Sequence, residues 1–160
     1  MVVLLDLDGV LITTPAWRAV EAAADGFCQF NGRATTNLAA ILAETQAALV
    51  LTTSHRISYS VAQWTTLLNA RGLFPSAISK VNDRDTLPPP GSRAGEIATW
   101  VTQQEAVNYV VLDDDLSLHG LPAAIESRCV FTKPLLGLDA TATRQALHIL
   151  RSNATPPTPC

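Results

Sequence analysis

The sequence has little of what marks secreted, zinc-binding or nucleic-acid-binding proteins. Its three cysteines are odd in number and widely spaced, and no C-x-x-C pair occurs among its 160 residues. This pattern argues against a disulfide framework and against a zinc site, and it suits a reducing compartment. The lysines and arginines are scattered, and the net charge is −3. No basic stripe therefore indicates nucleic acid as a partner.

Long hydrophobic runs are also missing. The apolar run at the N-terminus covers only Val2 to Leu5 before it meets Asp6, and no basic region precedes it. A membrane-spanning helix needs about 20 apolar residues, and a signal peptide begins with a basic region. We therefore expect a cytoplasmic protein without membrane contact.

The chain is instead rich in apolar residues. Hydrophobic residues make up 48% of the sequence and charged residues 16%. This composition excludes a disordered chain and is typical of a sheet buried between helices. A length of 160 residues predicts one domain, which we place at residues 1–151. Residues 152–160 contain three prolines and are predicted to be a flexible tail.

Apolar runs alternate with segments of helical period. Strands are predicted over residues 2–5, 47–51, 77–81, 108–112 and 128–131. Helices are predicted over residues 16–24, 38–46 with Asn37 as cap, from Ser58 or Ser60 to about Ala70, 93–104 and 140–151. Strands separated by helices predict a three-layer, Rossmann-like α/β domain with a mostly parallel five-stranded sheet.

The first predicted strand ends in two carboxylates. Asp6 and Asp8 stand at alternate positions and Gly9 follows them. Residues i and i+2 of a strand point the same way, and open α/β sheets bind ligands at the carboxyl ends of their strands. Two like charges placed together need a cation or a shared proton. A solvated Asp-Gly turn is the alternative interpretation of the same residues.

Two later strands also end in polar residues. Asp113, Asp114 and Asp115 follow the strand 108–112, and adjacent acids at a buried strand end favour a hard divalent cation such as Mg²⁺. Thr52 follows the strand 47–51, where its hydroxyl can donate to a phosphoryl oxygen. The ends of these parallel strands should meet at one edge of the sheet, which predicts an active site there. A solvated acidic loop and a hydroxyl that only caps a turn are the alternatives.

The residues around Thr52 leave several roles open. Thr53 and Ser54 follow it directly, so the register of the hydroxyl is open by one or two residues. Arg56 can offer a bidentate phosphate contact or can lie on the surface. His55 has no partner in the sequence that would tune it as a base.

These motifs resemble those of the haloacid dehalogenase (HAD) superfamily. Asp6-Leu7-Asp8-Gly9-Val10-Leu11 resembles its first motif, Thr52 its second, and Leu112-Asp113-Asp114 its fourth. With Glu96-Ile97-Ala98-Thr99-Trp100 and Gly137-Leu138, the chain looks like the small capless HAD domains that include those of "Swiss army knife" RNA-repair proteins. That group commonly has Trp-Arg after the second motif, where this chain has His55 and Arg56.

The resemblance implies a third motif, which is a lysine or arginine near the start of the helix before the Asp113 strand. Arg93 stands 113 − 93 = 20 residues before Asp113, about one helix and a turn away. Lys80 stands 113 − 80 = 33 residues before it, at the end of the weak third strand. We favour Arg93 as the cation that neutralises the nucleophile and the transferred phosphoryl group.

The same resemblance implies a Mg²⁺-dependent phosphatase. Asp6 is expected to attack phosphorus and Asp8 to serve as general acid and base. Mg²⁺ is expected on Asp6, the Asp8 backbone carbonyl and Asp114, with Asp113 supporting through a water. Thr52 and Arg93 are expected to hold the equatorial oxygens of the phosphoryl group. Because family members that cleave other bonds generally lack an acid at the second position, Asp8 favours phosphoryl transfer.

The stretch from Asp8 to Thr52 has no room for a large folded cap, so we expect an open site. Such a site would admit a phosphorylated macromolecule or a nucleotide, or would need a partner subunit as lid. Nucleic acid as substrate rests on analogy alone. A receiver domain is one rival, but its phosphorylated aspartate follows a mid-chain strand, where this chain has Thr52. A catalytically silent HAD-fold scaffold is the stronger rival, and the intact Asp6, Asp8 and Asp114 argue against it.

Overall fold

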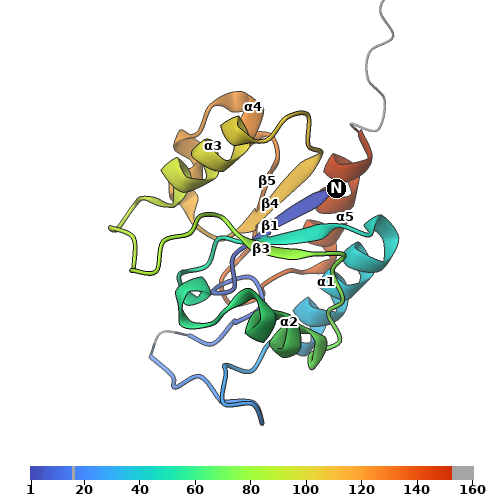
Figure 1. The fold of residues 1–160 in the computed structure, drawn as a ribbon. Coiled ribbons are helices and arrows are strands. Elements are labelled where there is room, and N and C mark those ends of the chain that lie inside the picture. The colour runs from blue at the N-terminus through green and yellow to red at the C-terminus, as the bar shows by residue number, and fades with distance from the viewer. Residues whose placement is uncertain (16, 153–160) are drawn as a thin grey trace, which may run out of the picture.

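The apolar runs of the sequence form one five-stranded sheet in the computed structural model (Figure 1), which describes residues 1–15 and 17–152. The strands are β1 (Val2–Leu5), β2 (Ala48–Leu51), β3 (Ile78–Lys80), β4 (Tyr109–Asp113) and β5 (Cys129–Phe131). Their order is β3-β2-β1-β4-β5, and every neighbouring pair is parallel. The predicted α/β class is therefore confirmed. Residues 153–160 of the predicted tail lie outside the described residues.

Helices cover both faces of this sheet (Figure 1). The α-helices are α1 (Gly32–Thr45), α2 (Val61–Asn69), α3 (Arg93–Gln103), α4 (Ala123–Glu126) and α5 (Ala140–Ser152), and the 3-10 helices are η1 (Ser54–Ser58) and η2 (Leu116–Gly120). Helices α1, α2 and α5 lie on one face, and α3 and α4 lie on the other. Within the described ranges, no helix is long and apolar enough to cross a membrane.

Strand β1 lies at the centre of the sheet and is buried from both sides. Val3 and Leu5 belong to the apolar cluster beneath α1, α2 and α5, whereas Leu4 belongs to the cluster beneath α3. This division follows from the alternation of side chains along a strand. The continuous apolar run is thus explained by a strand with no solvent-facing side. Asp6 follows Leu5, the last residue of β1, and so lies at the carboxyl edge of the sheet.

The helix predicted over residues 16–24 is wrong. Residues 17–24 form turns and irregular structure, and Ala22 pairs with Cys28 in an isolated bridge. Trp17 is 85% exposed and Val20 is 41% exposed, so this segment buries no apolar face against the core. A helix of this length without such packing is marginal in water.

Helix α1 begins earlier than predicted. Asn31 caps it, because its side chain accepts from the backbone N–H of Ala34 at 3.1 Å. Asn37, the predicted cap, lies inside the helix and donates to the carbonyl of Leu138 at 2.8 Å. Of the two caps considered for α2, Ser60 is the one used, in a capping box with Gln63.

Candidate active site

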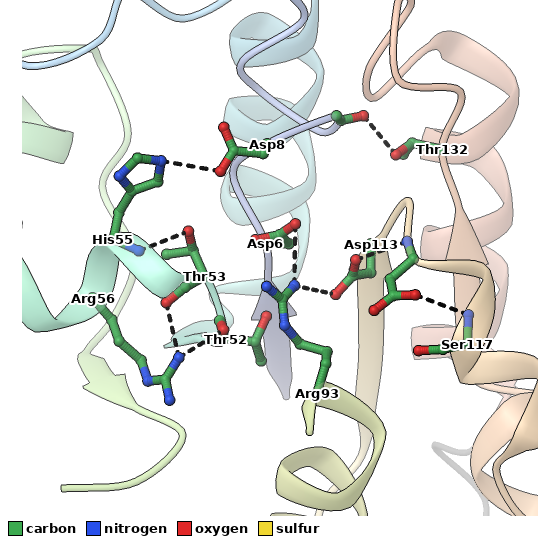
Figure 2. A network of polar contacts seen from close by, with 12 residues as sticks. Asp6, Asp8, Thr52, Thr53, His55, Arg56, Arg93, Asp113, Ser117 and Thr132 are labelled. Carbon is green, nitrogen blue, oxygen red and sulfur yellow. Dashed lines mark hydrogen bonds and ion pairs between the residues drawn. The ribbon is translucent and has the colours of Figure 1, made fainter. Parts of the chain in front are cut away.

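Three neighbouring strands bring Asp6, Thr52 and Asp113 to the same level of the sheet edge (Figure 2). In the register, Leu5 of β1 is opposite Leu51 of β2 and Leu112 of β4. Each of the three polar residues is the next residue along its strand, so parallel pairing places them side by side. The predicted convergence of these strand ends is therefore present in the structure.

The turn after Asp6 depends on glycine. Gly9 has φ +74, and a Cβ at this position would lie 2.2 Å from Oδ2 of Asp114. The carbonyl of Gly9 accepts a 2.7 Å hydrogen bond from the hydroxyl of Thr132, which follows β5. A side chain here would therefore both strain the backbone and displace an acid of the site.

Arg93 is the cation that reaches the acidic residues. It is the first residue of α3, and its Nη1 lies 3.1 Å from Oδ2 of Asp6 and 2.8 Å from Oδ2 of Asp113. Lys80, at the end of β3, forms no ion pair with any residue that the structure describes. The structure thus brings Arg93, and not Lys80, to the predicted position.

Asp6, Asp113 and Asp114 form a cluster in which one carboxylate oxygen from each lies within 4.8 Å of the others. Burial raises the pKa of Asp6, although Arg93 opposes the shift. Burial, together with the charge of Asp6, raises the pKa of Asp113 to about 6. Burial also raises the pKa of Asp114, and the charge of Asp113 adds to the shift. Three carboxylates face one guanidinium, so the cluster lacks positive charge.

The residues of this cluster fit a hard cation. Oδ1 of Asp6 is buried and has no hydrogen-bond partner in the described part of the chain. Asp113 is already committed, because its Oδ2 accepts from Arg93 and its Oδ1 from the backbone N–H of Asp115 at 3.0 Å. Asp6 and Asp114 therefore have the oxygens that remain for Mg²⁺, which prefers one or two carboxylates with waters and phosphate. This division agrees with the expected supporting role of Asp113.

Asp8 lies apart from the cluster and faces solvent. Its side chain is 59% exposed, and its Oδ2 lies 3.0 Å from Nε2 of His55 (Figure 2). This hydrogen bond raises the pKa of His55 against the effect of partial burial. The ring of His55 also contacts Phe27 edge-on, with centroids 5.4 Å apart. His55 therefore has the partner that the sequence did not reveal.

The two threonines after β2 have different roles. The side chain of Thr52 is fully buried, and its hydroxyl has no partner among the residues described. The hydroxyl of Thr53 accepts from the backbone N–H of His55 at 3.3 Å and so caps η1. The geometry thus favours Thr52 as the free hydroxyl of the site.

This geometry agrees with a comparison against protein families. Residues 2–143 match the family model described as the HAD domain in Swiss Army Knife RNA repair proteins. The chain belongs to this HAD family. No curated protein and no solved structure matches it significantly. The family resemblance inferred from the motifs is confirmed, and membership favours a hydrolase of the phosphatase type.

Arg56 of this HAD domain does not have the role expected from the sequence. Its side chain is fully buried, and its Nη2 pairs with Oε1 of Glu96 at 2.7 Å. Its Nη1 donates to the carbonyls of Thr52 at 3.1 Å and Thr53 at 3.0 Å (Figure 2). Both terminal nitrogens of the guanidinium therefore bind partners inside the protein. Both expected roles, a phosphate contact and a surface residue, are corrected.

The sequence did not reveal the contacts that three residues make around the HAD site: His55 with Asp8, Glu96 with Arg56, and Thr132 with Gly9. Their partners are 47, 40 and 123 residues away in the chain, so no local pattern connects them. Glu96 had one usable signal, because it stands one helical turn after Arg93 in the predicted helix. A buried acid at that spacing indicates an internal cation.

Proposed function

We propose that this HAD domain is a Mg²⁺-dependent phosphohydrolase that acts through an aspartyl-phosphate on Asp6. The observation that carries the proposal is the buried, unpartnered Oδ1 of Asp6. It lies in the acidic cluster, with the unpartnered hydroxyl of Thr52 on the neighbouring strand and with Arg93 bound to the other carboxylate oxygen. A nucleophile, an oxyanion donor and a cation are the groups that phosphoryl transfer requires.

In the first step, a carboxylate oxygen of Asp6 attacks phosphorus and the bond to the leaving oxygen breaks. Arg93 reduces the negative charge around Asp6 and the incoming phosphoryl group, and the hydroxyl of Thr52 donates to a phosphoryl oxygen. Mg²⁺, held by Asp6 and Asp114, would supply the positive charge that the cluster lacks.

Asp8 is suited to the proton transfers of both steps. As an acid it protonates the leaving oxygen, and as a base it then takes a proton from the water that attacks the phosphorylated Asp6. The second attack breaks the bond between Asp6 and phosphorus and releases phosphate. The exposed position of the Asp8 carboxylate supports this role because the leaving group must face solvent to depart.

We infer that the substrate is a phosphomonoester on a nucleotide or a macromolecule. Between Asp8 and Thr52, the described residues form a turn, an irregular segment, α1 and β2, and no cap domain lies among them. The half-exposed carboxylate of Asp8 also favours an open site. RNA ends are suggested only by the family description, which concerns RNA repair proteins.

The proposal is tested by phosphate release from an aryl phosphate, with and without Mg²⁺. The native chain should turn over only with Mg²⁺, and Asp6→Asn should lower kcat by at least about 10³-fold, as removal of a nucleophile does in other enzymes. Asp115→Asn is the matched control, because the Asp115 side chain accepts from the backbone N–H of Ser117 and so caps η2, a role that asparagine can also fill. Absence of both turnover and Mg²⁺ binding would overturn the proposal in favour of a silent scaffold.

A further inference from the structure

We propose that Arg56 is a positioning residue that fixes the distance between Thr52 and Arg93. These two side chains are the groups that hold the phosphoryl oxygens in the proposed function, on which this inference rests. Arg56 itself is fully buried and faces the backbone, so it has no route to the substrate. Its contacts link the two elements that carry Thr52 and Arg93.

The first link is to the backbone around Thr52. Nη1 of Arg56 donates to the carbonyls of Thr52 and Thr53, which follow β2 directly. The carbonyl of Arg56 in turn accepts from Nε1 of Trp64 at 3.3 Å, and Trp64 is fully buried in the core. The strand end that presents the Thr52 hydroxyl is therefore held from inside the protein.

The second link is to the helix that presents Arg93. Nη2 of Arg56 donates to Oε1 of Glu96 at 2.7 Å, and the same oxygen accepts from Nδ2 of Asn82 at 2.8 Å. Glu96 stands three residues after Arg93 on α3, which is about one helical turn. One guanidinium thus joins the backbone of Thr52 and Thr53 to the first turn of α3. The planar guanidinium of arginine has several N–H donors at fixed angles, so it can bridge two elements in this way.

Stability alone does not account for this pair. Buried ion pairs contribute little net stability compared with apolar residues of the same volume. Nε of Arg56 and Oε2 of Glu96 are also buried without a hydrogen-bond partner among the described residues, which costs free energy. What the pair provides is a fixed geometry between two parts of the site.

The test compares two variants with a control of the same residue type. The double variant Arg56→Met/Glu96→Leu removes both charges and keeps the volume, so no buried charge is left alone. Arg56→Lys keeps the charge, but its single ammonium cannot reach the two carbonyls and Glu96 together. Arg128→Met is the control, because Arg128 donates to the carbonyl of Tyr109 at the opposite end of the sheet.

We expect the double variant to unfold cooperatively and to lose about 10–100-fold in kcat with little change in KM, as misplaced reacting groups do. The kcat of Arg56→Lys should lie between those of the double variant and the native chain. Arg128→Met should keep the native kcat whatever its stability. A kcat within about twofold of native in the folded variants would overturn the inference, because a loss this small is far below the expected loss of about 10–100-fold.

A structural readout separates this inference from the proposed function. Crystal structures of the native chain and Arg56→Lys give the distance from Oγ1 of Thr52 to the guanidinium of Arg93, whether or not the chain hydrolyses phosphate. We expect a change of about 1 Å, the scale at which catalysis suffers. An unchanged distance would overturn the inference even if the native enzyme is active. If the native chain is inactive, the proposed function fails and the distance alone decides. Arg56→Lys serves equally if the double variant does not fold.

Discussion

Two arginines, the fully buried Arg56 and the partly exposed Arg93, stand on either side of Thr52 (Figure 2), and their surroundings differ in charge. Arg93 faces Asp6 and Asp113, with Asp114 beside them, so three carboxylates share one cation. Arg56 faces one carboxylate, Glu96, and otherwise backbone carbonyls and Asn82. The first cluster is incomplete without a further cation, whereas the second is balanced in charge. A buried cluster out of charge balance indicates a binding site, and a balanced one indicates scaffold.

Removing each arginine in turn gives the largest expected difference. Arg56→Met leaves the charge of Glu96 buried without a cation, so we expect the free energy of unfolding to fall by about 3–5 kcal/mol. Mg²⁺ should not restore it. Arg93→Met leaves carboxylates that a divalent cation can neutralise, so Mg²⁺ should restore its stability. Urea unfolding with and without Mg²⁺ measures both, and equal recovery of the two variants would show that the two arginines do not differ in charge balance.

A second pair of variants separates backbone strain from damage to the acidic cluster. Gly9 and Gly26 both have positive φ, and the backbone strain of alanine at either position should cost about 1–2 kcal/mol. Only at Gly9 would the new Cβ meet Asp114, because nothing lies within 4 Å of a Cβ at Gly26. Gly9→Ala should therefore weaken Mg²⁺ binding by about 10–100-fold, and Gly26→Ala should not. Calorimetry that finds equal Mg²⁺ affinities would contradict the placement of Asp114.

The stabilisation by Mg²⁺ should depend on pH. Burial raises the pKa of Asp113 from 3.8 to about 6, so the folded chain binds more protons than the unfolded chain within this window. The stability of the metal-free protein should therefore fall as pH rises through it. Mg²⁺ should raise the melting temperature by several degrees near about pH 8 and by less near about pH 5, where protonated acids bind it poorly. A Mg²⁺-induced shift in melting temperature that is independent of pH would place the cation elsewhere.

The smallest effect concerns His55 at the exposed side of the site. Its pKa should lie above 6.5, because the hydrogen bond with Asp8 favours the charged ring. The stability from this pair is fully present below the unfolded pKa of His55 and is lost as pH rises through the folded value. An NMR titration of the ring should show the pKa returning toward 6.5 in Asp8→Asn and unchanged in Asp115→Asn. An unchanged pKa in Asp8→Asn would disprove the pairing.

The sequence was sufficient to predict the sheet and the polar residues at the carboxyl ends of its strands. Asp6, Thr52 and Asp113 each follow an apolar run long enough for a buried strand, and parallel pairing then brings the three together. The helix expected over residues 16–24 failed because periodicity does not reveal whether an apolar face finds a core. Trp17 and Val20 stay exposed, and the segment stays irregular.

The roles of single side chains near the site were harder to predict. Arg56 stands beside the second motif in the sequence, but one turn of η1 directs its side chain into the interior toward Glu96. His55 acquires its partner only when β1 and β2 pair, which places Asp8 within reach. Both roles depend on tertiary contacts between distant segments, which local pattern does not contain.

The cluster of Asp6, Asp113 and Asp114, which has more negative than positive charge, is expected to bind a divalent cation. Calorimetric titration of Mg²⁺ into the native chain, Asp114→Asn and Asp115→Asn measures this binding. We expect binding at a single site in the native chain, affinity lower by at least about tenfold in Asp114→Asn, and native affinity in Asp115→Asn. No binding by the native chain, or equal affinity in Asp114→Asn, would show that the cluster is not a cation site.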